Sequence, residues 1–185
     1  MSTNEVSSKP YDLIVYGATS FVGQILTHYL VETLGVNRDI SWAIASRSES
    51  KLATLKDSLG TIASELPVLI ADSHDEASLQ ALCSQTRVVI STVGPYALYG
   101  ELLIKTCAET GTDYTDLTGE AHWIGQMKEK YNQAAEASGA RIVNCCGFDS
   151  IPSDMGVFAM QKRAQAKFGH PLPHAKLRVK AMKGG

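Results

Sequence analysis

Short apolar runs alternate with longer stretches of helical pattern along most of the 185 residues, and this alternation limits the possible folds more than any other feature. The expected strands are Tyr11–Tyr16, Ile40–Ala45, Val68–Ala71, Val88–Val93, Tyr114–Asp116 and Arg141–Cys145. Most of these runs are continuously apolar rather than alternating in polarity, as in strands that are covered on both faces. The pattern predicts repeated βαβ units around a parallel sheet.

The segments between the expected strands have the composition and the ends of helices. The expected helices are Phe21–Leu34, Glu49–Leu59, Asp75–Thr86, Glu101–Thr110, His122–Ser138 and, after the last strand, about Pro152–Phe168. Glycine follows most of them and can close the last turn, and Ser73 with Glu76 is expected to form a capping box before the third. The sequence therefore predicts an α/β fold of the Rossmann type, a doubly wound parallel sheet of six strands in the order 3-2-1-4-5-6.

The two ends of the chain do not follow this pattern. Residues 1–10 are polar and are expected to be disordered, and residues 11–169 are expected to form the Rossmann domain. Residues 170–185 are expected to be a linker followed by a strand at Lys176–Met182, the first strand of a truncated second domain. That segment is also a possible surface for forming a homodimer.

Charge and cysteine content exclude several classes of protein. The net charge is −2 and no cluster of Lys and Arg stands out, which argues against binding to nucleic acid or to an anionic membrane. Residues 13–31 carry no charged side chain, but glycine, threonine and glutamine among them favour a buried strand and helix over a membrane span. The four cysteines lie in expected helices and strands, as reduced thiols of a cytoplasmic protein do. We therefore expect a soluble, cytoplasmic protein.

A glycine-rich turn joins the first expected strand to the first expected helix. Its sequence is Gly17-Ala-Thr-Ser-Phe-Val-Gly23, and such a turn can direct backbone N–H groups and the positive end of a helix at a pyrophosphate. Ser20 stands where a middle glycine is commoner, and its hydroxyl could donate a hydrogen bond to a phosphate. The residues of this loop expected to contact a dinucleotide are Gly17, Thr19, Ser20, Phe21, Val22 and Gly23. The alternative is an ordinary tight turn that binds nothing.

The end of the second expected strand bears on which dinucleotide is bound. An NAD site usually places Asp or Glu there, whereas this chain has Ser46-Arg-Ser48. Arg47 offers a planar set of donors for a 2′-phosphate, and Ser46, Ser48 and Lys51 can add further donors. The acid that follows, Glu49, can be read as compensation of the helix dipole. The pattern favours NADP(H), with a solvated surface arginine as the alternative.

Further contacts to the cofactor are expected after the third and fourth strands, because ligands of open α/β sheets lie outside the carboxyl ends of the strands. After the fourth strand these are Val93, Gly94, Pro95 and Tyr96, with Gly94 leaving room for the nicotinamide half. Asp72, after the third strand, either flanks the adenine or is a turn residue before the Ser73 cap. The sequence does not decide between these two roles of Asp72.

No catalytic residue can be assigned from the sequence. None of the tyrosines has Lys four residues later, so the Tyr-x-x-x-Lys mechanism of short-chain dehydrogenases is not expected. Candidate proton donors at sheet ends are Tyr96, Tyr99, Asp116, Glu120, Asp149 and Asp154, although a structural role is the commoner one for each. No metal site is expected, since Cys145 and Cys146 would point to opposite faces of a strand.

Several motifs together resemble the saccharopine dehydrogenase-like oxidoreductases, a family that includes the trans-acting enoyl reductases. They are Tyr11-Asp-Leu-Ile-Val-Tyr-Gly-Ala-Thr-Ser-Phe-Val-Gly23, Trp42-Ala-Ile-Ala-Ser-Arg-Ser48, Thr92-Val-Gly-Pro-Tyr-Ala-Leu-Tyr-Gly-Glu101, Tyr114-Thr-Asp-Leu-Thr-Gly-Glu120 and Cys145-Cys-Gly-Phe-Asp-Ser-Ile-Pro-Ser-Asp154. The resemblance runs from Tyr11 to the end and implies NADP as cofactor, with a substrate domain beyond residue 185. It further implies a small-molecule substrate, lipid-like or derived from an amino acid. Two alternatives are a non-catalytic NADPH sensor or scaffold and a homologue associated with a lipid surface, for which the segment has no amphipathic helix.

Overall fold

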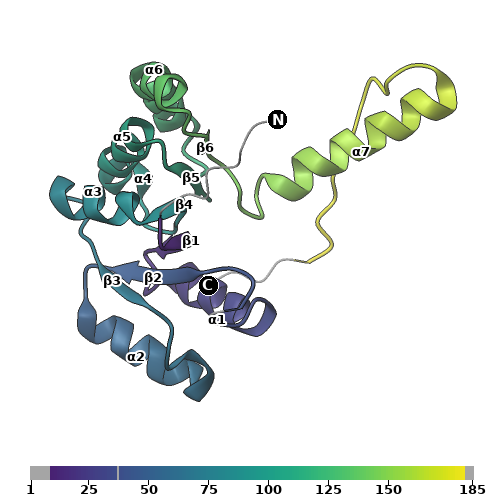
Figure 1. Ribbon diagram of the computed structural model, residues 1–185. Helices are drawn as coiled ribbons and strands as arrows, with labels where there is room; N and C mark the ends of the chain where they lie inside the picture. Colours follow the sequence, from purple (N-terminus) through teal and green to yellow (C-terminus); the bar gives the residue numbers. More distant parts are fainter. Residues whose placement is uncertain (1–8, 37, 182–185) are drawn as a thin grey trace, which may run out of the picture.

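The computed structural model describes residues 9–36 and 38–181, and their strands form one sheet (Figure 1). The strands are β1 (Tyr11–Tyr16), β2 (Trp42–Ser46), β3 (Val68–Ile70), β4 (Thr86–Ser91), β5 (Asp113–Asp116) and β6 (Ile142–Val143). Every neighbouring pair is parallel, and the order across the sheet is β3-β2-β1-β4-β5-β6. The predicted fold class and strand order are confirmed.

Helices cover both faces of the sheet. They are α1 (Phe21–Thr33), α2 (Glu49–Leu59), the 3-10 turn η1 (Thr61–Ala63), α3 (Glu76–Ser84), α4 (Tyr96–Tyr99), α5 (Glu101–Thr110), α6 (Ala121–Ser138) and α7 (Ile151–Phe168). Helices α1 and α2 lie on one face, whereas α3, α5 and α6 lie on the other (Figure 1). As predicted, α5 and α6 end at glycines in the left-handed conformation, Gly111 and Gly139.

Two apolar cores hold these layers together. On the α1 and α2 face, Val15 and Ile44 of the sheet pack with Leu30 and Leu52 of the helices. On the other face, the sheet packs against α3, α5 and α6 through a cluster that includes Val89. Since β1 and β2 have buried residues in both clusters, their continuous apolar sequence is explained by burial on both faces.

The pairing of β1 with β4 creates the point at which the strand order reverses. The end of β1 lies beside the end of β4, with Tyr16 opposite Ser91 in the register. The chain leaves β1 toward β2 on one side and leaves β4 toward β5 on the other. In doubly wound folds, a crevice opens at this position between the two loops.

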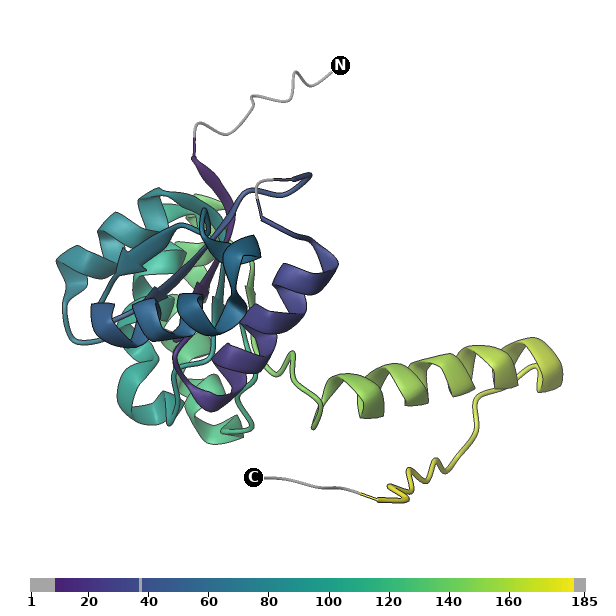
Figure 2. The same ribbon diagram turned by 90° about the horizontal axis from the view of Figure 1, so that it is seen from below.

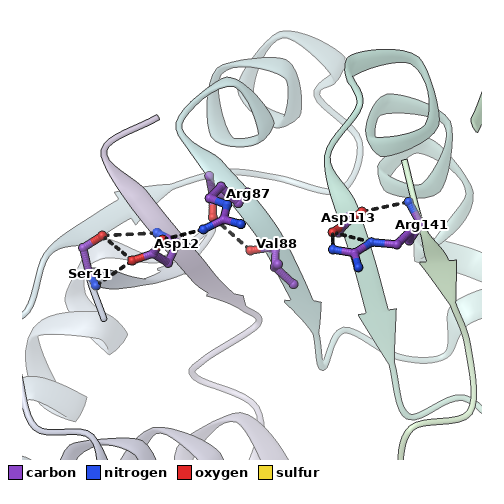
Figure 3. Close-up of polar contacts among 7 residues, drawn as sticks. Asp12, Ser41, Arg87, Val88, Asp113 and Arg141 are labelled. Atoms are coloured by element: carbon purple, nitrogen blue, oxygen red, sulfur yellow. Dashed lines mark hydrogen bonds and ion pairs between the residues drawn. The ribbon is translucent and has the colours of Figure 1, made fainter. Parts of the chain in front are cut away.

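The opposite, amino-terminal edge of the sheet carries polar contacts that join neighbouring strands (Figure 3). Asp12 accepts hydrogen bonds from the backbone N–H and the hydroxyl of Ser41, each at 3.1 Å, and from Arg87 at 3.2 Å. Asp113 forms a similar pair with Arg141, accepting from its backbone N–H and its guanidinium. These contacts fix the strand ends that lie farthest from the crevice.

Three sequence predictions about single elements are wrong. The capping box of Ser73 and Glu76 does not form, because Asp75 is the N-cap of α3 and accepts from the N–H of Ala77. The fourth strand ends at Ser91 and not at Val93. The last strand stops at Val143, since Cys145 has φ of 62°.

The C-terminal part of the described chain extends away from the sheet. Helix α7 projects from the body as a nearly free rod (Figures 1 and 2), and only Ala164 of its residues is buried. Residues 170–181 form no strand, so the strand expected at Lys176–Met182 is absent as far as residue 181, and Met182 lies outside the described residues.

At the other end of the chain, the disorder expected at residues 1–10 falls mostly outside the described residues. Lys9 and Pro10 of this segment are described, and the ammonium of Lys9 donates to the hydroxyl of Thr112 and to the carbonyl of Cys83.

Candidate dinucleotide site

A cleft of about 440 Å³ opens at the carboxyl ends of β1, β2 and β4. Its size is typical of a site for a small organic ligand. It is lined by Tyr16, Gly17, Thr19, Ser20, Ser46, Arg47, Ser48, Lys51, Ser73, Thr92, Val93, Gly94, Pro95 and Tyr99. The glycine loop, the corner after β2 and the loop after β4 therefore meet around one cavity at the switch point.

The glycine loop requires glycine at both of its ends. Gly17 has φ of +85°, and a Cβ there would lie 2.6 Å from Val93 and 2.8 Å from the hydroxyl of Thr92. A Cβ at Gly23 would lie 2.2 Å from the carbonyl oxygen of Gly17, so the first turn of α1 can pack on the loop only without a side chain there. The two glycines together bring the start of α1 against the end of β1.

The start of α1 presents free backbone donors. The N–H of Gly23 is capped by the hydroxyl of Ser20 at 3.0 Å, whereas no acceptor is found for the N–H groups of Phe21 and Val22 among the described residues. The side chains of Phe21 and Val22 are hydrocarbons without a donor, so these two residues can serve a bound anion through their backbone only. Unpaired N–H groups at a helix N-terminus are the donors that bind phosphate in such loops.

The hydroxyl of Ser20 lies at the junction of the glycine loop and the loop after β4. Thr92 donates its single proton to the carbonyl oxygen of Gly17 at 2.8 Å, and its oxygen lies 3.0 Å from that of Ser20. The hydroxyl of Ser20 also accepts from the N–H of Gly23 at 3.0 Å. It therefore helps to hold the loop in shape while Ser20 lines the cleft.

The corner after β2 carries the positive charge of the cleft. Arg47 is exposed beside the buried Ser46, and Ser46 accepts from the N–H of Ser48 at 3.1 Å. Ser48 is the N-cap of α2 and accepts from the N–H of Lys51 at 3.4 Å, which places the two cations in the same wall. Glu49, the acid that complicated the sequence prediction, does not line the cleft.

Asp72 lies beside this corner but outside the cleft lining. Its carboxylate accepts from the backbone N–H of His74 at 2.9 Å and lies 3.2 Å from the His74 ring. The N–H of His74 is the main cause that lowers the pKa of Asp72, and Arg47 contributes a smaller part. Of the two readings from the sequence, the turn role is the one visible in the structure, although Asp75 and not Ser73 caps the helix.

Tyr96 also lies outside the cleft lining. It is 6% exposed, its hydroxyl donates to the carbonyl oxygen of Ser91 at 3.0 Å, and its ring is 5.7 Å from that of Trp123. Burial raises the pKa of Tyr96 to about 12. It is therefore a core residue that fixes the loop after β4, and its hydroxyl proton is engaged within the fold.

Among the other candidate proton donors, the two carboxylates that follow β5 are engaged in the structure. Asp116 is 2% exposed and accepts four hydrogen bonds, from Tyr114, Thr118, Asn144 and Cys145. Glu120 accepts from the backbone N–H groups of Tyr96 and Ala97. Asp149 and Asp154 are exposed near the start of α7, and Tyr99 is the candidate that lines the cleft.

Nine of the residues selected from the sequence line the cleft, namely Gly17, Thr19, Ser20, Ser46, Arg47, Ser48, Val93, Gly94 and Pro95. The five that do not are Phe21, Val22, Gly23, Asp72 and Tyr96. Sequence reasoning did not select Tyr16, Ser73 and Thr92, whose polar groups also lie there. Tyr16 is the last residue of β1, and Thr92 directly follows β4. Their position at the switch point was the signal that could have identified them.

The described residues also bear on metal binding and on membrane-spanning helices. Within residues 9–36 and 38–181, no group of three or more His, Cys, Asp or Glu side chains could hold a metal ion. No helix in this part of the chain is both long and apolar enough to cross a membrane.

A doubly wound parallel sheet with a glycine loop at its switch point and a cationic corner after β2 defines a dinucleotide-binding domain. The chain belongs to the family described as the saccharopine dehydrogenase NADP binding domain, whose model matches residues 13–143. NADP is the cofactor of this domain. The free N–H groups of Phe21 and Val22 and the guanidinium of Arg47 are donors of the kind that bind phosphate groups.

Comparisons with known proteins agree with this assignment. A protein of Mycobacterium tuberculosis that is named, provisionally, a trans-acting enoyl reductase is 40% identical over 177 residues, which are 96% of this chain and 42% of the relative. The lipid droplet localized protein of Caenorhabditis elegans is 40% identical over 164 residues, 86% of this chain and 38% of the relative. The chain thus spans about two fifths of the length of these relatives.

A solved structure shares the fold. The apo saccharopine dehydrogenase (L-Glu forming) of Saccharomyces cerevisiae superimposes with a TM-score of 0.59 at 21% identity. The likeness covers 83% of this chain and 32% of the yeast enzyme.

Proposed function

We propose that this chain is the cofactor-binding part of an NADPH-dependent reductase whose substrate is lipid-like or derived from an amino acid. The observation that carries the proposal is the arrangement of the glycine loop and Arg47 around one cleft. Bound NADPH supplies the hydride, so the residues of the chain have to bind the cofactor, orient it and keep water away from it.

Each wall of the cleft has its own part in this proposal. Gly17, Thr19 and Ser20 line the cleft, and the N–H groups of Phe21 and Val22, which follow them at the positive end of α1, hold the pyrophosphate. Arg47 and Lys51 hold the 2′-phosphate, and their charges distinguish NADPH from NADH. The loop after β4, with Val93, Gly94 and Pro95, faces the nicotinamide half.

Of the candidate proton donors Tyr99 lines the cleft, and its hydroxyl makes no hydrogen bond to a general acid or base among the described residues. Tyr96, Asp116 and Glu120 are held by hydrogen bonds within the fold, and none of their proton-bearing atoms reaches the cleft. We therefore expect the 185-residue chain alone to bind NADPH without turning over substrate. The name of the Mycobacterium tuberculosis relative favours an enoyl substrate, with reduction of a carbon–carbon double bond.

The experiment follows the absorbance of NADPH during incubation with enoyl thioesters and with mixtures of an amino acid and an oxo acid. It compares the 185-residue chain with a longer form that has the full length of the relatives. We expect turnover by the longer form with one of the two substrate classes. If the longer form binds NADPH and oxidises it with neither class, the reductase proposal is wrong.

A second candidate function is an NADPH sensor or scaffold without catalysis. The observation that favours it is the engagement of the candidate carboxylates in structural hydrogen bonds. NADPH binding that alters association with another protein, without any turnover, would identify this function.

The location and partners of the protein form a separate proposal. We propose a cytoplasmic protein whose α7 carries apolar side chains toward a substrate domain or a second copy of the chain, including Met155 and Phe158, which are 49% and 54% exposed. Light scattering of the isolated chain tests self-association. A fluorescent fusion tests location, and a ring around lipid droplets, as the name of the Caenorhabditis elegans relative describes, would contradict a diffuse cytoplasmic distribution.

A further inference from the structure

Glu120 lies at the start of α6 but forms its contacts with another helix. Its two carboxylate oxygens accept hydrogen bonds from the backbone N–H groups of Tyr96 at 2.8 Å and Ala97 at 2.9 Å. These are the first two residues of α4, and they lie 24 and 23 positions away along the chain. A side chain that follows β5 thus caps the helix that follows β4.

Helix α4 needs an acceptor from outside. It has four residues, and its N-cap, Pro95, makes no side-chain hydrogen bond. The first N–H groups of any helix have no partner within the helix, and a carboxylate satisfies them better than a neutral group does. Glu120 supplies both acceptors at once, in the geometry of a two-pronged cap.

This cap fixes one end of the cleft wall formed by Val93, Gly94 and Pro95. The other end is fixed by Thr92, whose backbone N–H donates to the carbonyl oxygen of Tyr16 at 2.9 Å. Next to the cap, the Tyr96 hydroxyl bonds back to Ser91 at 3.0 Å, so the loop returns to the strand from which it left. The three residues between these points make no other side-chain hydrogen bond in the described part of the chain beyond a 3.5 Å contact from the N–H of Val93 to Ser91.

Glu120 is in turn held in place by its own surroundings. Its backbone N–H donates to the hydroxyl of Thr118 at 3.1 Å, and Thr118 is bound through its N–H to the buried Asp116. The carboxylate is therefore placed by the end of β5, which is a neighbour of β4 in the sheet. The end of β5 thus determines, through Glu120, the position of the loop that follows β4.

We infer that Glu120 is a positioning residue for the nicotinamide half of NADP(H), acting through the wall formed by Val93, Gly94 and Pro95. This inference rests on the proposed placement of the cofactor in the cleft. It assigns a function to the Tyr114–Glu120 motif, which contributes no residue to the cleft lining. Since Glu120 acts on the wall and not on the adenine end, its loss weakens only those ligands that possess a nicotinamide.

The test compares NADPH with 2′,5′-ADP, a fragment that has the adenine end and the 2′-phosphate but no nicotinamide. Both are titrated into the wild-type chain, Glu120→Ala and Glu120→Gln. Glu129→Ala is the matched control, since Glu129 is an exposed carboxylate of α6 without a hydrogen bond among the described residues. Emission of bound NADPH gives a second readout, because it responds to the surroundings of the nicotinamide.

We expect Glu120→Ala to weaken NADPH binding about tenfold, because the wall is no longer preorganised, while 2′,5′-ADP binds as before. Glu120→Gln keeps one acceptor and should fall between wild type and Glu120→Ala, and Glu129→Ala should match wild type. Equal losses for both ligands, or no loss for either, would overturn the inference. If the wild type binds 2′,5′-ADP but not NADPH, the placement of the cofactor fails instead. If Glu120→Ala does not fold, the graded loss in Glu120→Gln decides the matter.

Discussion

The hydroxyl oxygens of Ser20 and Thr92 lie 3.0 Å apart and join the glycine loop to the loop after β4. They are 72 positions apart in the chain and belong to the two halves of the doubly wound sheet. Thr92 also bonds to the carbonyl oxygen of Gly17, so one buried hydroxyl contacts both the first residue and the middle of the phosphate loop. The serine that replaces the more common glycine is therefore part of the framework of the cleft.

Thr92→Val should destabilise the fold by about 1–3 kcal/mol, because the isosteric side chain removes the hydrogen bonds of the Thr92 hydroxyl to the carbonyl of Gly17 and to the hydroxyl of Ser20. Urea unfolding measures this loss. Thr33→Val, at an exposed helix position, is the control and should change stability little. An unchanged unfolding midpoint in Thr92→Val would show that the bridge contributes nothing.

Gly17→Ala and Gly94→Ala should differ strongly in stability. The first places a Cβ 2.6 Å from Val93 at φ of +85°, whereas the second places one 3.5 Å from the ring of Tyr96, an ordinary contact. We expect Gly17→Ala to cost about 1–3 kcal/mol and to lower the melting temperature by several degrees, with Gly94→Ala close to wild type. Equal melting temperatures for the two variants would contradict the geometry of the loop.

The double contact of Asp12 with Ser41 should make stability depend on pH in the acid range. The backbone N–H of Ser41 is the largest cause that lowers the pKa of Asp12 below 3.8. A lowered pKa in the folded state stabilises the fold above the unfolded pKa, and this contribution is lost as pH falls through the folded value. Asp12→Asn should thus be less stable than wild type at neutral pH, with the difference vanishing in strong acid.

The control for this experiment is Asp57→Asn, which alters an exposed carboxylate of α2 that accepts no side-chain hydrogen bond in the described residues. Chemical unfolding is measured for both variants across the acid range. A difference between Asp12→Asn and wild type that is the same at every pH would exclude the ionised carboxylate as its source.

Much of the fold could be predicted from the sequence, because its signals are local. Apolar runs and the glycines after helices mark the strands and helix ends within a few residues, and the strand order follows from the general rules for βαβ units. The last strand was predicted too long. Asp116, 29 positions earlier, accepts the N–H of Cys145 and draws the chain out of the sheet.

The candidate site was predictable in its location but not in all of its roles. Gly17 and Arg47 line the cleft as their positions after strands suggested. Tyr96 and Glu120 were assigned to cofactor binding or proton transfer, but neither lines the cleft, and their hydrogen bonds go to other parts of the fold. Each of these partners lies on a different strand or helix, and such contacts cannot be read from the spacing of residues along the chain.

Arg47→Ala should reduce the affinity for NADPH about tenfold or more and leave that for NADH nearly unchanged. The guanidinium would donate charge-assisted hydrogen bonds to the 2′-phosphate, worth about 1.5–3 kcal/mol, and NADH has no such group. Calorimetric titration measures both affinities. The control is Arg87→Ala, at the opposite edge of the sheet, which should leave both unchanged (Figure 3). Equal losses for NADPH and NADH would exclude Arg47 as the discriminating residue.

The central claim is that the cleft at the switch point binds NADP(H) and selects it through the cationic corner after β2. Calorimetric titration of the wild-type chain with NADPH and with NADH tests this claim most directly. We predict one cofactor per chain and an affinity for NADPH at least about tenfold higher than that for NADH. Equal affinities, or no binding of NADPH by the folded chain, would contradict it.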